Sequence, residues 1–122
     1  MKKVSSGMLA VIGAASFLIS GPAFAHAKLA SSNPADHATV SVAPKAISLT
    51  FNENLVPAFS KFEVTMPEHG MAVPVKTAVA KDGKTLVGTP ARALSKGTYK
   101  IVWSAATADG HKMTGELNFK VG

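Results

Sequence analysis

The chain has 122 residues, which is enough for one domain but short for two. It carries 13 Lys and Arg against 7 Asp and Glu, a net charge of +6, yet the lysines are scattered singly and form no basic patch of the kind that binds nucleic acid. Cysteine is absent, which excludes blue-copper electron-transfer sites, thiolate zinc sites and cysteine nucleophiles.

Residues 1–25 have the pattern of a secretory signal peptide. Two lysines near the start precede an apolar run from Met8 to Ile19, and an Ala-Phe-Ala cleavage pattern closes the segment. The apolar run is shorter than the roughly 20 residues that cross a bilayer, so a permanent membrane anchor is the weaker alternative. We therefore expect export to the periplasm, removal of residues 1–25, and one domain over residues 26–122 that begins at His26.

From residue 26 onward, apolar and polar residues alternate with a period of two, which predicts half-buried strands. Asp82-Gly83 is a strong hairpin-turn signal between two such runs. Seven strands are expected, near residues 26–31, 45–51, 60–66, 73–79, 84–89, 97–106 and 113–121. This spacing predicts an all-β, seven-stranded Greek-key sandwich of the immunoglobulin type, with a small closed barrel as the alternative. Trp103 is expected in its core.

His26 is the strongest candidate for chemistry. After cleavage it offers two nitrogens from one residue, its free α-amine and its imidazole Nδ1, which can close a six-membered chelate ring on a metal. Such nitrogen pairs suit Cu(II), which prefers tetragonal nitrogen and oxygen ligands. The alternative is that the cleavage site precedes a histidine by coincidence.

Asp109-Gly110-His111 makes that coincidence less plausible. On an extended segment, residues 109 and 111 would point to one side, and Gly110 would leave room for a close approach. If this segment lies beside the N-terminal strand, the amine and ring of His26 join Asp109 and His111 in a set of three nitrogens and one oxygen. That set fits Cu(II), is poor for Mg(II) or Ca(II), and does not exclude zinc.

A second group of candidates is Met66, His69 and Met71. Two thioethers and an imidazole within six residues are soft ligands of the kind that select Cu(I). The alternative is that Met66 belongs to the core and the other two lie in a solvated loop. Glu53 is a lesser candidate for an auxiliary carboxylate near the copper, with simple solvation as its alternative.

These motifs together resemble the CopC family of periplasmic copper-resistance proteins. The resemblance spans the mature chain and includes the segments His26 to Ala35, Leu49 to Val56, Met71 to Val73, Gly97 to Trp103 and Asp109 to Gly115. It implies a seven-stranded Greek-key barrel or sandwich, named cupredoxin-like or immunoglobulin-like. It also implies a Cu(II) site at His26, Asp109 and His111, and it matches the acidic residue at Glu53.

The family also places a Cu(I) site in a methionine-rich loop with a histidine. Met66, His69 and Met71 match the end of that loop, but the best-known members carry more methionines there. A protein that binds only Cu(II) is therefore the alternative to one with two copper sites.

The leading functional hypothesis is a non-enzymatic copper carrier or buffer in copper resistance, homeostasis or transport. It would pass copper to an inner-membrane copper importer or to another periplasmic copper protein. The runner-up is a copper-dependent oxidative enzyme, because polysaccharide monooxygenases also use an N-terminal histidine in a two-histidine brace. Against it, Asp109 would occupy a position that oxygen chemistry leaves open. A metal-free interaction module ranks last.

Overall fold

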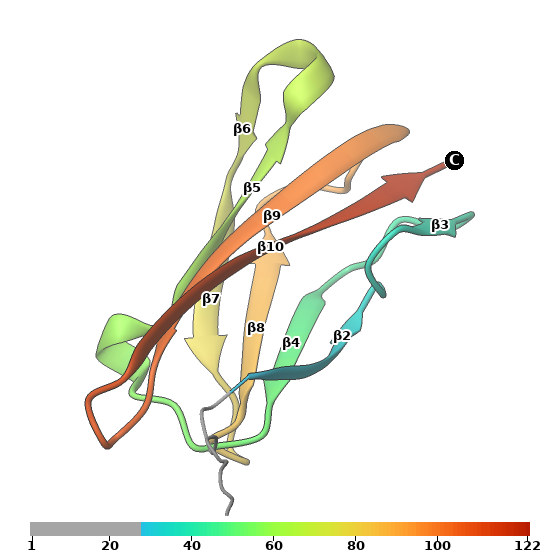
Figure 1. The fold of residues 1–122 in the computed structure, drawn as a ribbon. Helices are drawn as coiled ribbons and strands as arrows, with labels where there is room; N and C mark the ends of the chain where they lie inside the picture. The colour runs from blue at the N-terminus through green and yellow to red at the C-terminus, as the bar shows by residue number, and fades with distance from the viewer. Residues whose placement is uncertain (1–27) are drawn as a thin grey trace, which may run out of the picture.

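The computed structural model describes residues 28–122, which form two β-sheets packed face to face (Figure 1). One sheet has the strand order β3-β10-β9-β5-β6 and the other β2-β4-β8-β7. The strands are β2 (Leu29–Asn33), β3 (Ala38–Val40), β4 (Ile47–Phe51), β5 (Lys61–Met66), β6 (Met71–Val73), β7 (Val75–Val79), β8 (Thr85–Pro90), β9 (Gly97–Ala106) and β10 (Lys112–Val121). Two 3-10 turns, η3 (Pro57–Phe59) and η4 (Pro67–His69), flank β5. Within the described range, no helix is long and apolar enough to cross a membrane.

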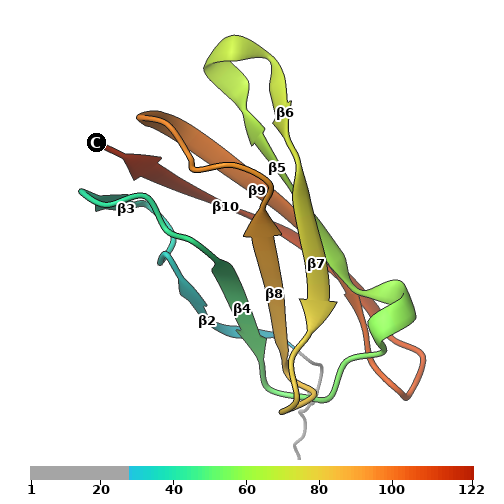
Figure 2. The same cartoon turned by 180° about the vertical axis from the view of Figure 1, so that it is seen from behind.

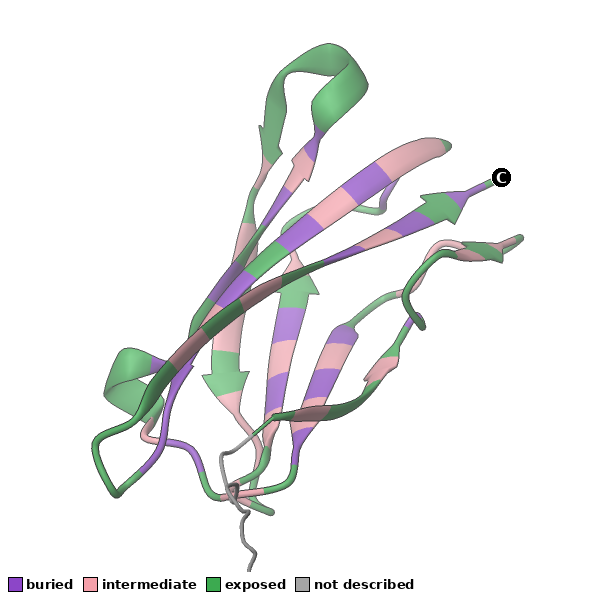
Figure 3. Cartoon of the chain, viewed as in Figure 1, coloured by how far each residue is buried: buried purple, intermediate pink, exposed green. Residues whose placement is uncertain are grey.

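The alternation of apolar and polar residues puts one face of each sheet in the core. In β4, Ile47, Leu49 and Phe51 are buried, whereas the two residues between them are only half-buried. Figure 3 shows the same alternation of buried and less buried bands along β9 and β8. The largest fully buried side chains are Tyr99, Phe51, Ile47, Leu49, Leu86, Ile101 and Val64, so both sheets contribute to one core.

Close contacts between the sheets fix their separation. Phe51 of β4 meets Trp103 of β9 edge to face, with ring centroids 5.1 Å apart. Gly88 of β8 lies against the ring of Phe62 of β5, where an added Cβ would come within 2.1 Å of a ring carbon. Trp103 is 7% exposed, which confirms its predicted place in the core.

The predicted all-β sandwich is confirmed, and each of the seven expected strands has a counterpart. The structure adds two three-residue strands, β3, which pairs in parallel with β10, and β6, which pairs with the end of β5. The first expected strand began at residue 26, but the observed strand β2 begins at Leu29, and residues 26 and 27 lie outside the described range. The Asp82-Gly83 turn joins β7 to β8 as predicted, with Gly83 at a φ of 75°.

Lys28 and three loops gather at one end of the sandwich, called here the 107–111 end. The loops cover residues 52–56, 80–84 and 107–111, and Figures 1 and 2 show them on the same side from front and back. Backbone hydrogen bonds hold this end together, from Asn52 N to Lys28 O (3.2 Å), from Leu55 N to Gly83 O (2.7 Å) and from Val56 N to Ala106 O at the end of β9 (2.8 Å). The β5–β6 hairpin lies at the opposite end. The ten residues of β9 run between the two ends, which corresponds to about 30 Å.

Candidate metal site

The loop of residues 107–111 joins β9 to β10 and is closed by its own backbone. The amide of Thr107 donates to the carbonyl of His111 (3.0 Å), and the amide of Gly110 donates to the carbonyl of Thr107 (2.9 Å). Gly110 has a φ of 92°, a conformation that residues with a side chain rarely adopt. An added Cβ there would meet no atom within 4 Å, so the turn requires glycine for its backbone conformation rather than to avoid a neighbouring atom.

Within this loop, Asp109 and His111 face each other. The Nδ1 atom of the His111 ring lies 2.9 Å from Oδ2 of Asp109, and the His111 amide donates to Oδ1 of the same carboxylate (3.2 Å). An ionised carboxylate can only accept hydrogen bonds, so Nδ1 is the donor and the lone pair of the neutral ring lies on Nε2. The carboxylate therefore fixes both the orientation and the tautomer of the imidazole.

Thr107 completes the arrangement, and sequence reasoning missed it. It is 3% exposed, and its hydroxyl donates a hydrogen bond to Oδ1 of Asp109. This hydroxyl, followed by the amide and the ring of His111, lowers the pKa of Asp109 to about 2. The Thr-x-Asp spacing was a readable signal, because a threonine hydroxyl commonly bonds a nearby polar group of a turn.

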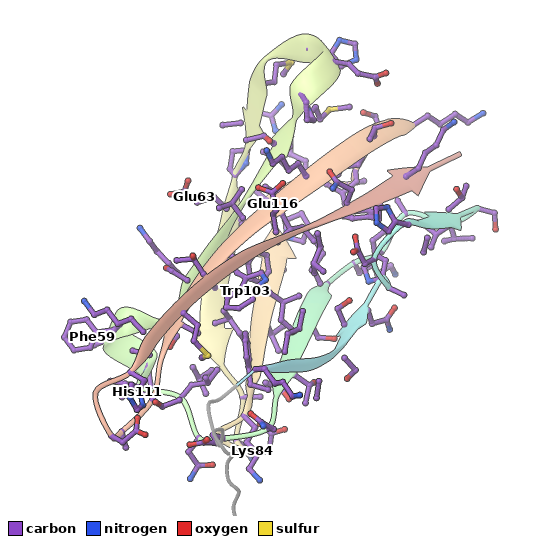
Figure 4. All side chains as sticks on the ribbon, viewed as in Figure 1. Phe59, Glu63, Lys84, Trp103, His111 and Glu116 are labelled. Atoms are coloured by element: carbon purple, nitrogen blue, oxygen red, sulfur yellow. The ribbon has the colours of Figure 1, made fainter. Side chains whose placement is uncertain are left out.

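The pair nevertheless remains accessible at the surface. The side chains of His111 and Asp109 are 57% and 52% exposed. Figure 4 shows His111 in the loop between β9 and β10, at the same end of the molecule as the exposed ring of Phe59. The next residue, Lys112, places its ammonium 5.6 Å from the centre of that ring. A metal held here would be within reach of a second protein.

His26, the first predicted ligand, lies outside the described residues. Lys28, the first described residue, is held at the 107–111 end by Asn52, which accepts from the Lys28 amide through Oδ1 (2.8 Å). The described chain therefore begins at this end of the sandwich. Sequence reasoning also missed Asn52, since an asparagine after a strand is usually only a turn residue.

Glu53, the predicted auxiliary carboxylate, is half-buried in the same 52–56 loop. Among residues 28–122, however, no group of three or more His, Cys, Asp or Glu side chains lies close enough to hold a metal ion. The described structure thus brings Asp109 and His111 together and leaves Glu53 outside that pair.

Met66, His69 and Met71 lie at the opposite end, in and beside the β5–β6 hairpin. Met66 and Met71 are direct cross-strand partners, and both line a surface hollow of about 390 Å³. Met66 is 7% exposed and packs in the core, as the alternative interpretation expected, whereas Met71 is 56% exposed. His69 ends η4 on the exposed tip and is not among the residues that line the hollow. The structure therefore pairs the two thioethers and places His69 on the exposed 3-10 turn between them.

Comparison with known proteins places the chain in a family. The model of the CopC domain matches residues 29–122. Copper resistance protein C of Xanthomonas campestris pv. juglandis is 44% identical over 117 residues, which cover 91% of each chain. Copper resistance protein C of Pseudomonas syringae pv. tomato is 45% identical over 114 residues, covering 88% of this chain and 90% of that protein.

A solved structure supports the same placement. The crystal structure of PcoC, described as a methionine-rich copper resistance protein from Escherichia coli, is 39% identical to this chain. It superposes with a TM-score of 0.74 over 80% of this chain and 100% of that one. The family match covers nearly all of the described residues, and the identity holds over almost the full length of these relatives. The chain belongs to the CopC family.

Proposed function

We propose that this protein is exported to the periplasm, where it holds Cu(II) at its mature N-terminus and hands it on as a carrier or buffer. Family membership supports a role in copper resistance. The observation that carries the finer proposal is the His111 ring, oriented by Asp109 2.9 Å away, at the end of the sandwich where the chain enters through Lys28.

The proposed donor set is the amine and Nδ1 of His26, Nε2 of His111 and an oxygen of Asp109. Three nitrogens and one oxygen match the tetragonal preference of Cu(II). Asp109 contacts Nδ1, on the far side of the imidazole from Nε2, so it would give up this hydrogen bond when one of its oxygens binds the same ion as Nε2. Glu53 lies in the neighbouring 52–56 loop, directly after Asn52, and would serve only as an auxiliary carboxylate.

The exposure of the site favours a carrier over an enzyme. A carrier must release its cargo to another protein, which requires the metal to be reached from outside, and the Asp109 and His111 side chains are more than half exposed. Next to the loop, a hollow of about 370 Å³ is lined by Phe59, Lys61 and Lys112 among others. We propose an inner-membrane importer or another periplasmic copper protein as the recipient.

The experiment compares Cu(II) binding by three forms of the mature protein: one that begins at His26, one with a single residue added before it, and the His111→Ala variant. His37→Ala is the matched control, because the His37 side chain is 80% exposed and pairs with Asp36, away from the 107–111 loop. The extension and His111→Ala should each weaken binding and change the electron paramagnetic resonance spectrum from its tetragonal, nitrogen-rich form. Unchanged affinity after the extension would refute the proposal.

The same experiment separates the oxidative alternative. A histidine-brace enzyme would form hydrogen peroxide from oxygen when supplied with a reductant, and would give oxidised sugar products with a polysaccharide. A carrier should show no sugar oxidation above that of free Cu(II), and should transfer its copper to a chelating acceptor.

A second binding function, for Cu(I), is favoured by the pairing of Met66 with Met71. The two thioethers share one face of the hairpin and one hollow, and soft sulfur ligands select Cu(I). Anaerobic Cu(I) titration of Met71→Leu tests it, because leucine keeps the bulk of an exposed side chain and removes the sulfur. His69→Ala, whose ring does not line the hollow, should have the smaller effect; equal Cu(I) affinity in Met71→Leu would exclude the site.

A further inference from the structure

Asn52 makes two hydrogen bonds with the backbone of Lys28, one through its own backbone and one through its side chain, and this pair of bonds is called here the bracket. Its backbone amide donates to the carbonyl of Lys28 (3.2 Å), as in an ordinary antiparallel ladder. The reciprocal bond is different, because the amide of Lys28 donates to the side-chain oxygen Oδ1 of Asn52 (2.8 Å). A side chain thus joins Lys28, where the described chain begins, to the residue that follows β4.

The bracket lies where β2 is otherwise weakly held. In the sheet order β2 is an edge strand, and β4 is its one neighbour within that sheet. The register with β4 also shifts between Leu29 and Ser31, which leaves Ala30 as a bulge. Strand ends with few hydrogen bonds open locally at little cost in free energy. What keeps Lys28 in place is therefore the contact with Asn52, together with the pairing of Leu29 with Phe51.

Lys28 is connected through the 52–56 loop to the 107–111 loop. The 52–56 loop is tied to the 107–111 loop by the bridge between Leu55 and Thr107, and to the end of β9 by the bond from Val56 N to Ala106 O (2.8 Å). Asn52, three residues before Leu55, thereby connects the entering chain to the loop that carries Asp109 and His111.

We infer that Asn52 is a positioning residue for copper binding: its side chain fixes Lys28 at the 107–111 end, from which the amine and ring of His26 would have to reach His111. This inference rests on the proposed Cu(II) function. Bringing two halves of a chelate together in advance raises their effective concentration, and a lost hydrogen bond at that point lowers it. Removing the Asn52 amide should weaken Cu(II) binding about five- to tenfold.

The experiment uses the mature protein that begins at His26, with Asn52→Ala as the test variant. Asn52→Ala keeps the backbone bond from residue 52 to Lys28, and position 52 is exposed, so the fold and the thermal midpoint should change little. In the metal-free protein, hydrogen exchange at the Lys28 amide should accelerate about tenfold or more, because its acceptor is gone. Cu(II) affinity should fall by the factor above, with broader resonance lines from a less uniform site.

Asn54, two positions along the same exposed loop, supplies the matched controls. Asn54→Ala should leave Lys28 exchange and Cu(II) affinity unchanged. Asn52→Asp keeps an oxygen acceptor and should restore slow exchange and most of the affinity, while Asn54→Asp shows what an added negative charge does without the bracket.

The outcomes are distinguishable. If the one-residue extension before His26 leaves Cu(II) affinity unchanged, the proposed function fails and this inference falls with it. If the extension weakens binding but Asn52→Ala does not, the copper site stands and the positioning role of Asn52 is overturned. Normal Lys28 exchange in Asn52→Ala would overturn it as well.

Discussion

The hydroxyl of buried Thr107 donates a hydrogen bond to the carboxylate of exposed Asp109. One member of the pair is fixed in the protein interior, and the other stands in solvent beside His111. Because the buried partner cannot rotate freely, it anchors the exposed carboxylate and, through it, the imidazole. The buried Thr107 side chain thereby restricts the motion of the exposed Asp109 and His111 side chains.

Replacing Thr107 by valine should loosen this chain of contacts. Valine keeps the shape of the side chain but removes the hydroxyl, which is the largest cause of the lowered Asp109 pKa. The pKa should rise from about 2 toward the ordinary carboxyl value of 3.8. A lowered pKa stabilises the fold above about pH 4, and this contribution is lost as the pH falls through about 2. In Thr107→Val the contribution should be smaller, and its loss should be complete at a higher pH.

A carbon-13 nuclear magnetic resonance titration of the Asp109 carboxyl measures this directly. Thr107→Ser is the control, because serine retains the hydroxyl and should retain the low pKa. Cu(II) affinity should fall in Thr107→Val and hold in Thr107→Ser. An Asp109 pKa near 2 in the valine variant would mean that the His111 contacts suffice.

Gly110→Ala tests whether the 107–111 loop needs glycine for its backbone conformation, because there is room for a side chain at that position. The residue has a φ of 92°, and an added Cβ meets nothing within 4 Å, so the cost is backbone strain alone. Such strain costs on the order of 1–3 kcal/mol, and part of it should be relieved by opening the turn that brings His111 to Asp109. We expect a lower free energy of unfolding in urea and weaker Cu(II) binding.

Gly70→Ala is the comparison variant for this prediction. It also has a positive φ, 59°, with nothing within 4 Å of an added Cβ, but it lies in the hairpin at the other end. It should lower stability without weakening Cu(II) binding. If both variants weaken Cu(II) binding equally, the effect of Gly110→Ala is a general loss of stability.

The architecture was predictable where the polar–apolar alternation ran long enough. The runs around β4, β5, β9 and β10 each bury one face, and the period of two follows directly from that burial. The two short strands were not predictable, because three residues give no period. β3 exists through its parallel pairing with β10, a contact between residues about 80 apart that no local pattern encodes.

At the candidate site, the meeting of Asp109 and His111 was expected from their spacing, but for a reason that proved wrong. The expectation assumed an extended segment, whereas these residues lie in a closed turn with Gly110 at positive φ. Thr107 and Asn52 act through contacts within a turn and between strands. Their residue types were visible in the sequence, but which groups they would meet depends on the three-dimensional fold. The role of His26 stays a prediction.

Gly115→Ala tests the packing of the single tryptophan. Gly115 is paired with Trp103 across β9 and β10, and an added Cβ would lie 2.5 Å from Cζ2 of the indole. The ring is 7% exposed and held against Phe51, so it has little room to move. Overpacking of this kind costs about 1–3 kcal/mol, which urea unfolding followed by circular dichroism should detect.

The smaller ring in Trp103→Phe should relieve that clash. In a double-mutant cycle, the loss from Gly115→Ala should be smaller in the Trp103→Phe background than in the native one. Additive losses would show that the destabilisation comes from somewhere other than the indole. Thr114→Ala, at the exposed neighbouring position, controls for a change in strand propensity.

Cu(II) should raise the thermal stability of the mature protein, and the size of the rise should report how well the site converges. A ligand at about 100 times its Kd adds about 2.7 kcal/mol to the free energy of unfolding if it binds only the folded state. For a domain of this size that is a rise in Tm of about 10 °C or more. The unfolded chain, however, keeps the His26 amine and ring side by side, so it retains part of the affinity and the observed rise should be smaller than this limit.

His111→Ala shows how much of the rise in Tm comes from ligands that only the folded chain brings together. In that variant the folded and unfolded chains would hold Cu(II) mainly through the same terminal residue, so the metal should hardly distinguish them and the rise in Tm should largely vanish. His37→Ala should keep the full rise, because its exposed ring pairs with Asp36 rather than with the 107–111 loop. A rise that survives in His111→Ala would mean that Cu(II) stabilises the fold at some other set of ligands, and the convergence of the terminus with the 107–111 loop would have to be abandoned.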